Sequence, residues 1–535
     1  MGPFSDSSPR PFYRVLLPRG NSMKWICIVL VVFSCFVSTI QAQQIAASNP
    51  GCEHQSAKEC LNLALGAMGG RERLREVRSV RLETIGHTLL MEQSYRQDPF
   101  ITSYERATTT LDLANQRVLS EVRLTWPESD DNQSESTSVA VVGPEGGVRR
   151  GKDADTPCSL ADLDTARYAL ALGPVPLLLT ADQASDLHFE KPEMLRSTRH
   201  TVLAFSWQKV PVRILLNRFN HLPDAVETTQ QFHDFWYFWG DVWQRVYFDN
   251  WKLVRGVAYP TNLVEERNGA IWRSAQALKV ELNAPVQESA FRMDAATAKK
   301  SIASLGWKRP FRGDTPVALA PGIDFFPGPW NSTIVRQSDG TVIVEAPIGE
   351  PHTQGVIEEA KKRYPRLPIK AVLSTSDSWP HTGGVRFAVS QGLPVYILDL
   401  NRPLLDRLIE ARHSVDPDSL EKSITRKPPM WRIVSAREQL GTGPNRLELY
   451  PLRGASTERQ YMVYFPEQHL LYASDTLVIN EDNTLYDPEL MNEVVQAVRR
   501  ENLQVDRVFA MHQGPTAWNH VLDLLEKSQH PQETK

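Results

Sequence analysis

Residues 369–384 read IKAVLSTSDSWPHTGG, and this stretch decides the fold of the C-terminal half of the chain. Its first residues are mostly apolar, as expected for a buried strand, and a polar loop follows them. Gly383 and Gly384 then open an apolar segment with helical spacing. The stretch therefore predicts a strand, a loop that presents polar side chains, and a helix.

The same alternation extends in both directions from this loop. Upstream, an Asp339-Gly340 turn joins STIVRQS to TVIVEAP in a predicted hairpin, and a helix is expected over 354–364. Downstream lie PVYILDL, the helix RPLLDRLIEAR, a second set of strands (RLELYPL, YMVYFP and HLLYASD), the helix PELMNEVVQAVRR, the strand DRVFAM and a last helix. This order predicts an α/β sandwich over 321–530, with two sheets covered by helices.

Residues 43–299 have a different rhythm, in which apolar and polar residues alternate with period two. One helix is predicted at 160–172, and Asn268-Gly269 between two such runs predicts a hairpin. The pattern indicates an antiparallel β-rich domain, curved or half-barrel-like, and the phrase LLNRFNHLPDAVE loosely resembles periplasmic lipoprotein-carrier-like domains. Residues 300–320, rich in Gly, Pro and basic side chains, are predicted to be the linker.

The aromatic run FHDFWYFWGDVWQRVYFDNW, at 232–251, has two interpretations. It could line a groove for an apolar or small-molecule ligand, or it could fill the core of the sheet to which it belongs.

The N-terminal residues predict export. Lys24 precedes WICIVLVVFSCFVSTI, an apolar run that ends at Gln41-Ala42, so residues 23–42 are predicted to be a signal peptide cleaved after Ala42. Residues 1–22 then form an extension upstream of the true start at Met23. A retained membrane anchor and lipidation at Cys35 are the alternatives. The expected location is periplasmic or secreted, with membrane contact only through the signal segment.

The cysteines and the net charge indicate which disulfide can form and which class of partner is excluded. After cleavage Cys52, Cys60 and Cys158 remain, and a Cys52–Cys60 disulfide and free thiols are both compatible with the sequence. The 535 residues carry a net charge of −4 with mixed signs, which gives no basic surface for nucleic acid. The oligomeric state is left open.

The order of VIVEAP, PHTGGV, YMVYFPEQHLLYASDTL and VFAMHQGP resembles the metallo-β-lactamase superfamily over about 320–530. The resemblance implies an αββα sandwich with a site for two zinc ions. In that family a THxHxDHxGG loop, a further His, an Asp after a strand and a last His supply the ligands.

Most of these ligand positions are altered in this chain. Ser376 and Ser378 occupy the first two His positions of the loop, Pro380 occupies the Asp position, and Ser456 falls at or next to the following His position. The resemblance leaves three candidate metal ligands, which are His381, Asp475 and His512. Serine hydroxyls are poor zinc ligands, so the expected cofactor is either none or a single zinc ion.

Two functions compete on this evidence. One is a residual mononuclear hydrolase of an ester, amide or thioester, in which a zinc-bound water attacks the substrate. The other is a non-catalytic binding or scaffold protein of the cell envelope, in which Asp475 and His512 form a metal-free pair. A serine triad built from Ser376, Ser378 or Ser456 is a third idea, but no nucleophile-elbow sequence accompanies it. Whether the chain is an enzyme is therefore open at this point.

Overall fold

The computed structural model describes residues 49–90, 101–125, 135–313 and 315–529. The predicted extension at 1–22 and the predicted signal at 23–42 lie outside the described residues. From Asn49 onward the chain forms one compact unit. Within the described ranges, no helix is long and apolar enough to cross a membrane.

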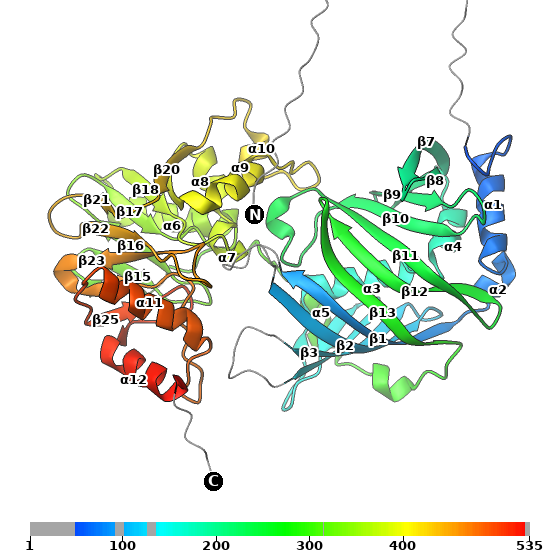
Figure 1. Ribbon diagram of the computed structural model, residues 1–535, viewed down its shortest axis with the longest axis horizontal. Helices are drawn as coiled ribbons and strands as arrows, with labels where there is room; N and C mark the ends of the chain where they lie inside the picture. Colours follow the sequence, from blue (N-terminus) through cyan, green and yellow to red (C-terminus); the bar gives the residue numbers. More distant parts are fainter. Residues whose placement is uncertain (1–48, 91–100, 126–134, 314, 530–535) are drawn as a thin grey trace, which may run out of the picture. The chain divides into compact units, whose positions relative to one another are not determined.

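The N-terminal half contains one large antiparallel sheet, as its period-two pattern predicts (Figure 1). The sheet order is β6-β5-β4-β3-β2-β1-β13-β12-β11-β10-β9-β8-β7, so that the first strand pairs with the last. Its strands are β1 (Ser79–Leu90), β2 (Ile101–Asp112), β3 (Arg117–Thr125), β4 (Ser136–Gly143), β5 (Gly146–Arg149), β6 (Thr156–Pro157), β7 (His188–Leu195), β8 (Thr198–Trp207), β9 (Val210–Leu216), β10 (Pro223–Gln230), β11 (Val242–Val254), β12 (Val257–Arg267) and β13 (Ala270–Leu282).

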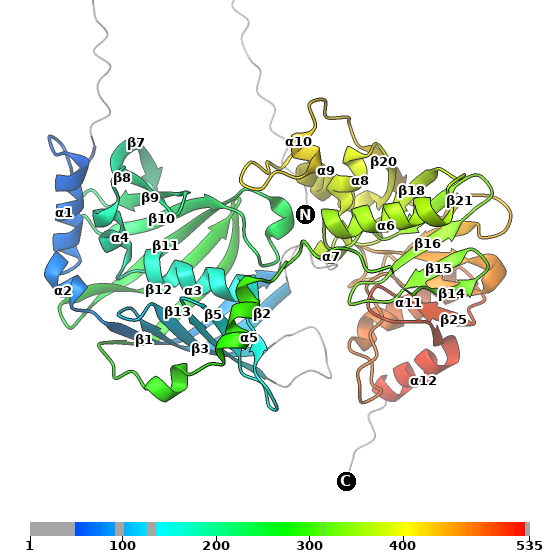
Figure 2. The same cartoon turned by 180° about the vertical axis from the view of Figure 1, so that it is seen from behind.

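The predicted Asn268-Gly269 hairpin joins β12 to β13, with both residues at positive φ (47° and 87°). Helices α1, α3 and α4 bury apolar side chains against one face of the sheet, and α5 packs on β5 (Figure 2). The helices of this half are α1 (Ala57–Ala67), α2 (Arg71–Arg75), α3 (Leu160–Leu172), α4 (Leu177–Gln183) and α5 (Ala295–Ile302). The helix predicted at 160–172 is confirmed, and α4 was not predicted.

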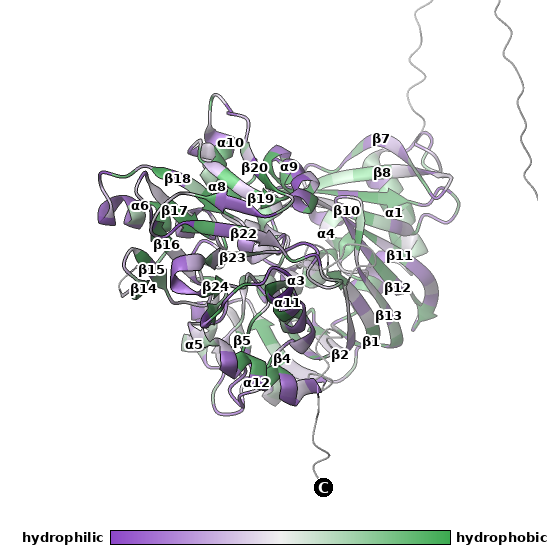
Figure 3. Ribbon diagram, turned by 60° about the vertical axis from the view of Figure 1, so that its left-hand side comes forward, coloured by the Kyte–Doolittle hydropathy of each residue, from purple (hydrophilic) through white to green (hydrophobic). Residues whose placement is uncertain are grey.

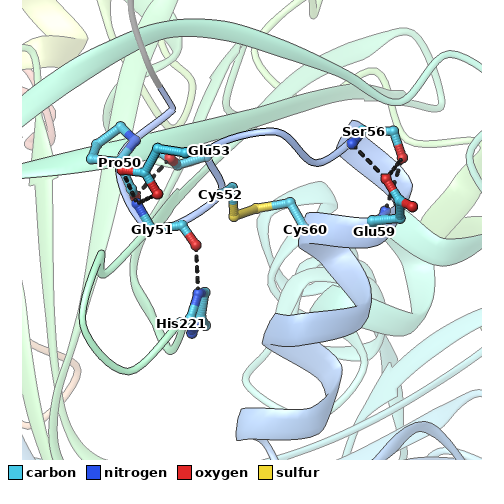
Figure 4. The surroundings of a disulfide bond; sticks show 9 residues. Pro50, Gly51, Cys52, Glu53, Ser56, Glu59, Cys60 and His221 are labelled. Carbon is cyan, nitrogen blue, oxygen red and sulfur yellow. Dashed lines mark hydrogen bonds between the residues drawn. A yellow bond between two sulfur atoms is a disulfide. The ribbon is translucent and has the colours of Figure 1, made fainter.

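A disulfide joins Cys52 to Cys60 at the start of α1 (Figure 4). Ser56 caps this helix with Glu59 in a capping box, and the His221 ring bonds the Gly51 carbonyl at 2.8 Å. Of the two alternatives for these cysteines, the structure contains the disulfide.

The C-terminal half contains two further sheets. The first has the order β14-β15-β16-β17-β18-β19-β20 and is parallel from β17 to β20, and the second runs from β21 to β26. These strands are β14 (Val317–Ala320), β15 (Ile323–Phe326), β16 (Ser332–Arg336), β17 (Thr341–Val344), β18 (Ile369–Leu373), β19 (Pro394–Leu398), β20 (Met430–Val434), β21 (Glu438–Leu440), β22 (Leu447–Pro451), β23 (Tyr461–Phe465), β24 (Leu470–Tyr472), β25 (Arg507–Phe509) and β26 (Thr516–Ala517).

The strands of this half bury both of their faces. In β17, Val342 and Val344 belong to a core cluster formed by both sheets, whereas Ile343 belongs to a cluster with helices α6, α8 and α9. Residues of β22 to β25 likewise pack against α11 and α12, along which hydrophobic and hydrophilic segments alternate (Figure 3). The helices are α6 (Glu350–Arg363), α7 (Trp379–Thr382), α8 (Val385–Ser390), α9 (Arg402–Glu410), α10 (Ser419–Lys422), α11 (Pro488–Arg500) and α12 (Trp518–Gln529).

The aromatic run at 232–251 divides into two parts: Phe248 and Trp251 of β11 pack in the core of their own sheet, as one interpretation held, whereas the first part packs elsewhere. Residues from Val242 onward form β11, but Phe232, Trp236, Tyr237, Phe238 and Trp239 are buried in a cluster with helices and strands of the C-terminal half. Within the predicted linker, Trp307 and Phe311 pack against the same cluster. The division of domains at 300–320 stays a prediction.

His413, which follows α9, is a buried histidine with a strongly shifted pKa. Burial, followed by the adjacent Arg386, lowers its pKa to about 4, although Asp418, Asp241 and Glu421 favour the charged ring. The folded state therefore holds this ring neutral at pH values where an unfolded chain, with an ordinary pKa near 6.5, begins to protonate it.

We expect His413 to reduce stability in acid. Its contribution should be intact above pH 6.5 and should decline as the pH falls toward 4, by up to about 3 kcal/mol. Urea unfolding at pH 7 and pH 4.5 measures the loss, which should be smaller in His413→Asn than in the wild type. The exposed His54→Asn control should lose as much stability as the wild type, and an equal loss in His413→Asn would contradict the prediction.

Candidate functional site

Glu345 lies at the end of β17 and is completely buried. Its Oε1 accepts a hydrogen bond from the Tyr472 hydroxyl at 3.1 Å and another from the Thr375 hydroxyl, while Oε2 lies 2.9 Å from Nδ1 of His381. The residue is held at a positive φ of 76°, which turns the chain from the strand into the loop before α6. A carboxylate without contact to solvent is thus held by two hydroxyls and one imidazole.

His381 lies in the short helix α7 and is also completely buried. Its Nδ1 faces Glu345 and its Nε2 lies 3.6 Å from Oδ2 of Asp475, but neither ring nitrogen has an aligned hydrogen-bond partner. Burial lowers the pKa of His381, but the charges of Glu345 and Asp475 outweigh it and raise the pKa to about 10. The ring is therefore held by opposite charges on both sides.

Asp475 follows β24 and links the buried ring to a more exposed one. Its Oδ1 lies 3.3 Å from Nε2 of His512, and the other ring nitrogen of His512 lies 2.8 Å from the Pro329 carbonyl. Burial would raise the pKa of Asp475, but its contacts with His381 and His512 hold that pKa well below its usual range. Burial lowers the pKa of His512, whereas Asp475 raises it, and the net shift is upward.

The four side chains form a row of alternating charge, which we call the charge row: Glu345, His381, Asp475 and His512. Exposure increases along it, since the side chains of Asp475 and His512 are 19% and 31% accessible and the first two are inaccessible. Sequence reasoning found three of its members. The structure brings all three together.

The four altered ligand positions behave in two ways. Ser376, Ser378 and Pro380 lie in the same loop as His381 and are fully buried, with the Ser378 N–H donating to the Ser376 hydroxyl at 3.1 Å. Ser456 instead donates its hydroxyl to Glu489 of α11 at 2.8 Å. The sequence resemblance put Ser456 at or next to a ligand position, and its N–H donates to Glu493, which also belongs to α11.

Two polar members of the site were missed. Glu345 is an acid placed directly after the apolar strand TVIV, and this position was a readable signal for a buried carboxylate. Gln460, whose side-chain oxygen accepts from the Asp475 N–H at 3.1 Å, has no such signal in the sequence.

Aromatic rings cover the loop that carries His381. Trp379 contacts Trp307, Phe235, Tyr237 and Trp330 at centroid separations of 4.5, 5.2, 5.8 and 6.2 Å. We call these four rings around Trp379 the aromatic cover. The Tyr237 hydroxyl also donates to the carbonyl of Ile348, next to the loop. Residues 371–382 are buried throughout.

The residues present do not fit the dinuclear zinc site of the family that the sequence resembles. In the alignment that the resemblance implies, serines stand at the positions of three imidazoles, and Pro380 has no side-chain donor for a metal. In the part of the chain that the structure describes, no group of three His, Cys, Asp or Glu side chains is arranged to hold a metal ion. His381, Asp475 and His512 contact one another as ion pairs instead.

Comparison with known proteins gives only distant likenesses. No family model and no curated protein matches the sequence. Among solved structures, the chain is similar to a metallo-beta-lactamase from Pontibacter korlensis (17% identity, 40% of this chain, 98% of that chain, TM-score 0.31). It is also similar to the metallo-beta-lactamase FIM-1 from Pseudomonas aeruginosa in the mono-zinc form (16% identity, 42% of this chain, 100% of that chain, TM-score 0.32).

A third solved structure, the inverting sec-alkylsulfatase Pisa1 from Pseudomonas sp., is 14% identical and aligns with 39% of this chain and 40% of its own (TM-score 0.29). TM-scores near 0.3 are too low to carry a conclusion about this chain, so its function must be argued from its own residues.

We expect Glu345 and His381 to be strongly coupled in stability. Glu345→Leu and His381→Leu should each destabilise the fold by about 3–5 kcal/mol, because each leaves a buried charge without its partner. The double variant should cost clearly less than the sum of the two. Chemical denaturation of the four proteins measures this coupling.

A matched control is the exposed pair formed by Lys370 and Asp339, whose charged atoms are 2.7 Å apart. Its coupling should be below about 1 kcal/mol. If the destabilisation of the double variant equals the sum of the two single variants, Glu345 and His381 do not stabilise each other, and the prediction is wrong.

Proposed function

We propose that this protein is an exported, non-hydrolytic binding protein whose C-terminal half is an αββα sandwich of the metallo-β-lactamase type. The motif order supports the type of fold, and so do the core clusters that link helices to each sheet and the two sheets to each other. The observation that carries the functional proposal is the charge row, in which carboxylates and imidazoles partner each other where the related fold holds metal.

The charge row supports a structural role because its buried charges are paired. An isolated carboxylate in the interior costs several kcal/mol, and Glu345 avoids that cost through two hydroxyls and His381. Each carboxylate of the row faces at least one imidazole. The fold can then keep these residues for stability after metal chemistry is lost.

The aromatic cover argues against a substrate reaching the loop of His381. A hydrolytic site needs room for substrate next to the attacking water, but Trp379 is under four rings and His381 is inaccessible. Displacing these rings would expose a large apolar area to water.

A place for a small ligand exists on the sheet of the N-terminal half. A cavity of about 390 Å³ is lined by side chains from adjacent strands: Ile85, His87, Tyr104, Arg106, Arg123, Asn262, Ser274 and Gln276 among others. Its lining mixes polar and apolar surface in about equal parts, so it fits a small molecule that carries both polar and apolar groups.

Export is supported by two independent features. The apolar run after Lys24 has the length and flanks of a signal peptide, and the Cys52–Cys60 disulfide suits an oxidising compartment.

A second candidate, a mononuclear metal-dependent hydrolase, is favoured by one observation. His381 Nε2 is buried without an aligned hydrogen-bond partner, and it faces Asp475, which in turn faces His512. A metal there would supply an activated water. The two candidates differ in metal content.

Purified protein should contain far less than one zinc ion per chain, before and after incubation with zinc and gel filtration. Zinc should not raise the thermal midpoint, because the ion pairs already occupy the donors. Nitrocefin and p-nitrophenyl acetate should not be hydrolysed above the rate of a His381→Ala variant. One zinc per chain that is lost in His512→Ala but retained in the exposed His469→Ala control would establish the hydrolase candidate instead.

The mature chain should begin near Gln43. Expression of the gene from Met23, followed by N-terminal sequencing of the envelope and culture fractions, tests this expectation. Recovery of intact, uncleaved chain from the cytoplasm would overturn the export proposal while leaving the metal experiment unaffected.

A further inference from the structure

Two turns of the N-terminal half expose large apolar side chains. Phe219 lies in the β9–β10 turn and Leu253 at the β11–β12 turn, and each is 76% exposed. Single exposed apolar residues are common on soluble proteins and need no explanation. Phe219 and Leu253, however, have their position and their charged neighbours in common.

The first shared feature is position. Helix α1 connects the two turns, since the Gly51 carbonyl before the helix accepts from His221, next to Phe219, at 2.8 Å (Figure 4). After the helix, the Met68 carbonyl accepts from the Ala258 N–H at 3.1 Å, just beyond the turn of Leu253. Both turns therefore lie at the end of the sheet covered by α1, which we call the docking end.

The second shared feature is charge. Arg218 precedes Phe219, and Lys252 and Arg255 flank Leu253, and all three basic side chains are exposed. Residues 217–222 and 250–257 contain no acidic residue. Each turn therefore presents an apolar side chain next to cations.

The docking end also contains acidic residues, several of which are hydrogen-bonded or ion-paired. Glu59 caps helix α1 through Ser56, and Glu53 accepts from the Gly51 N–H at 3.1 Å. Asp182 is paired with Lys58 and with neighbouring arginines. Residues 49–78, 217–222 and 250–257 together with Asp182 contain eight Lys and Arg residues and five Asp and Glu residues, so the net charge of the docking end is positive.

We propose that the docking end binds the surface of an anionic lipid bilayer. Phe219 and Leu253 enter the headgroup region, and Arg218, Lys252 and Arg255 contact lipid phosphates. Leu63 of α1, 39% exposed, lies between the turns along the same helix.

Flotation with vesicles of phosphatidylglycerol and phosphatidylcholine tests this proposal on the chain that begins at Gln43. The wild type should float with these vesicles at low salt, should float much less at 1 M NaCl, where charges are screened within about 3 Å, and should not float with pure phosphatidylcholine. The Phe219→Ser/Leu253→Ser variant should partition at least about tenfold more weakly. The Arg218→Gln/Lys252→Gln/Arg255→Gln variant should show a loss of similar size.

The matched control is Met194→Ser/Leu278→Ser, which removes two side chains of the same sheet that are 60% and 61% exposed. It should float like the wild type, and circular dichroism should show that all variants fold. Failure of the wild type to bind anionic vesicles would overturn the proposal, as would full binding by the Phe219→Ser/Leu253→Ser variant. Equal binding to phosphatidylcholine alone would overturn the assigned role of the basic residues.

Discussion

A buried carboxylate is stable only beside positive charge or hydrogen-bond donors, and the arrangement of the C-terminal half around Glu345 depends on this requirement. The hydroxyls of Thr375 and Tyr472 and the ring of His381 converge on it from three different segments. The positive φ values of Glu345 and Ser474 (76° and 58°) belong to the same arrangement, because these residues turn the chain at the ends of two strands. The strain is tolerable because the surrounding sheets are packed on both faces.

The same loop also ties the two halves of the chain together. Tyr237 and Phe235 come from the N-terminal half, and their rings lie against Trp379. Arg267 steadies this aromatic segment, since its guanidinium lies 3.8 Å from the centroid of Phe232 and pairs with Asp234. Burial of Trp379 thus depends on residues more than 100 positions away, and residues 371–382 are buried where the two halves meet.

The sequence predicted the elements well where short-range patterns decide them. Asn268 and Gly269 can both adopt positive φ, so their turn could be predicted, and the hairpin predicted at Asp339-Gly340 is present as the antiparallel pair of β16 and β17. His381, Asp475 and His512 were found because each follows a strand in a recognisable order. The position of Ser456 at or next to a ligand position stays a prediction, because the distance between strands is not fixed by any local rule; its N–H and hydroxyl donate to Glu493 and Glu489 of α11. The packing of the aromatic cover around Trp379 could not be predicted, because the residues that form it are far apart in the sequence.

The most direct test of the central claim is anomalous diffraction at the zinc absorption edge, from crystals grown in the presence of zinc. The account predicts no anomalous peak between His381, Asp475 and His512, with the His381 ring still lying between Glu345 and Asp475. A peak about 2.0–2.2 Å from both imidazoles and the carboxylate would contradict it, because those are zinc bonding distances.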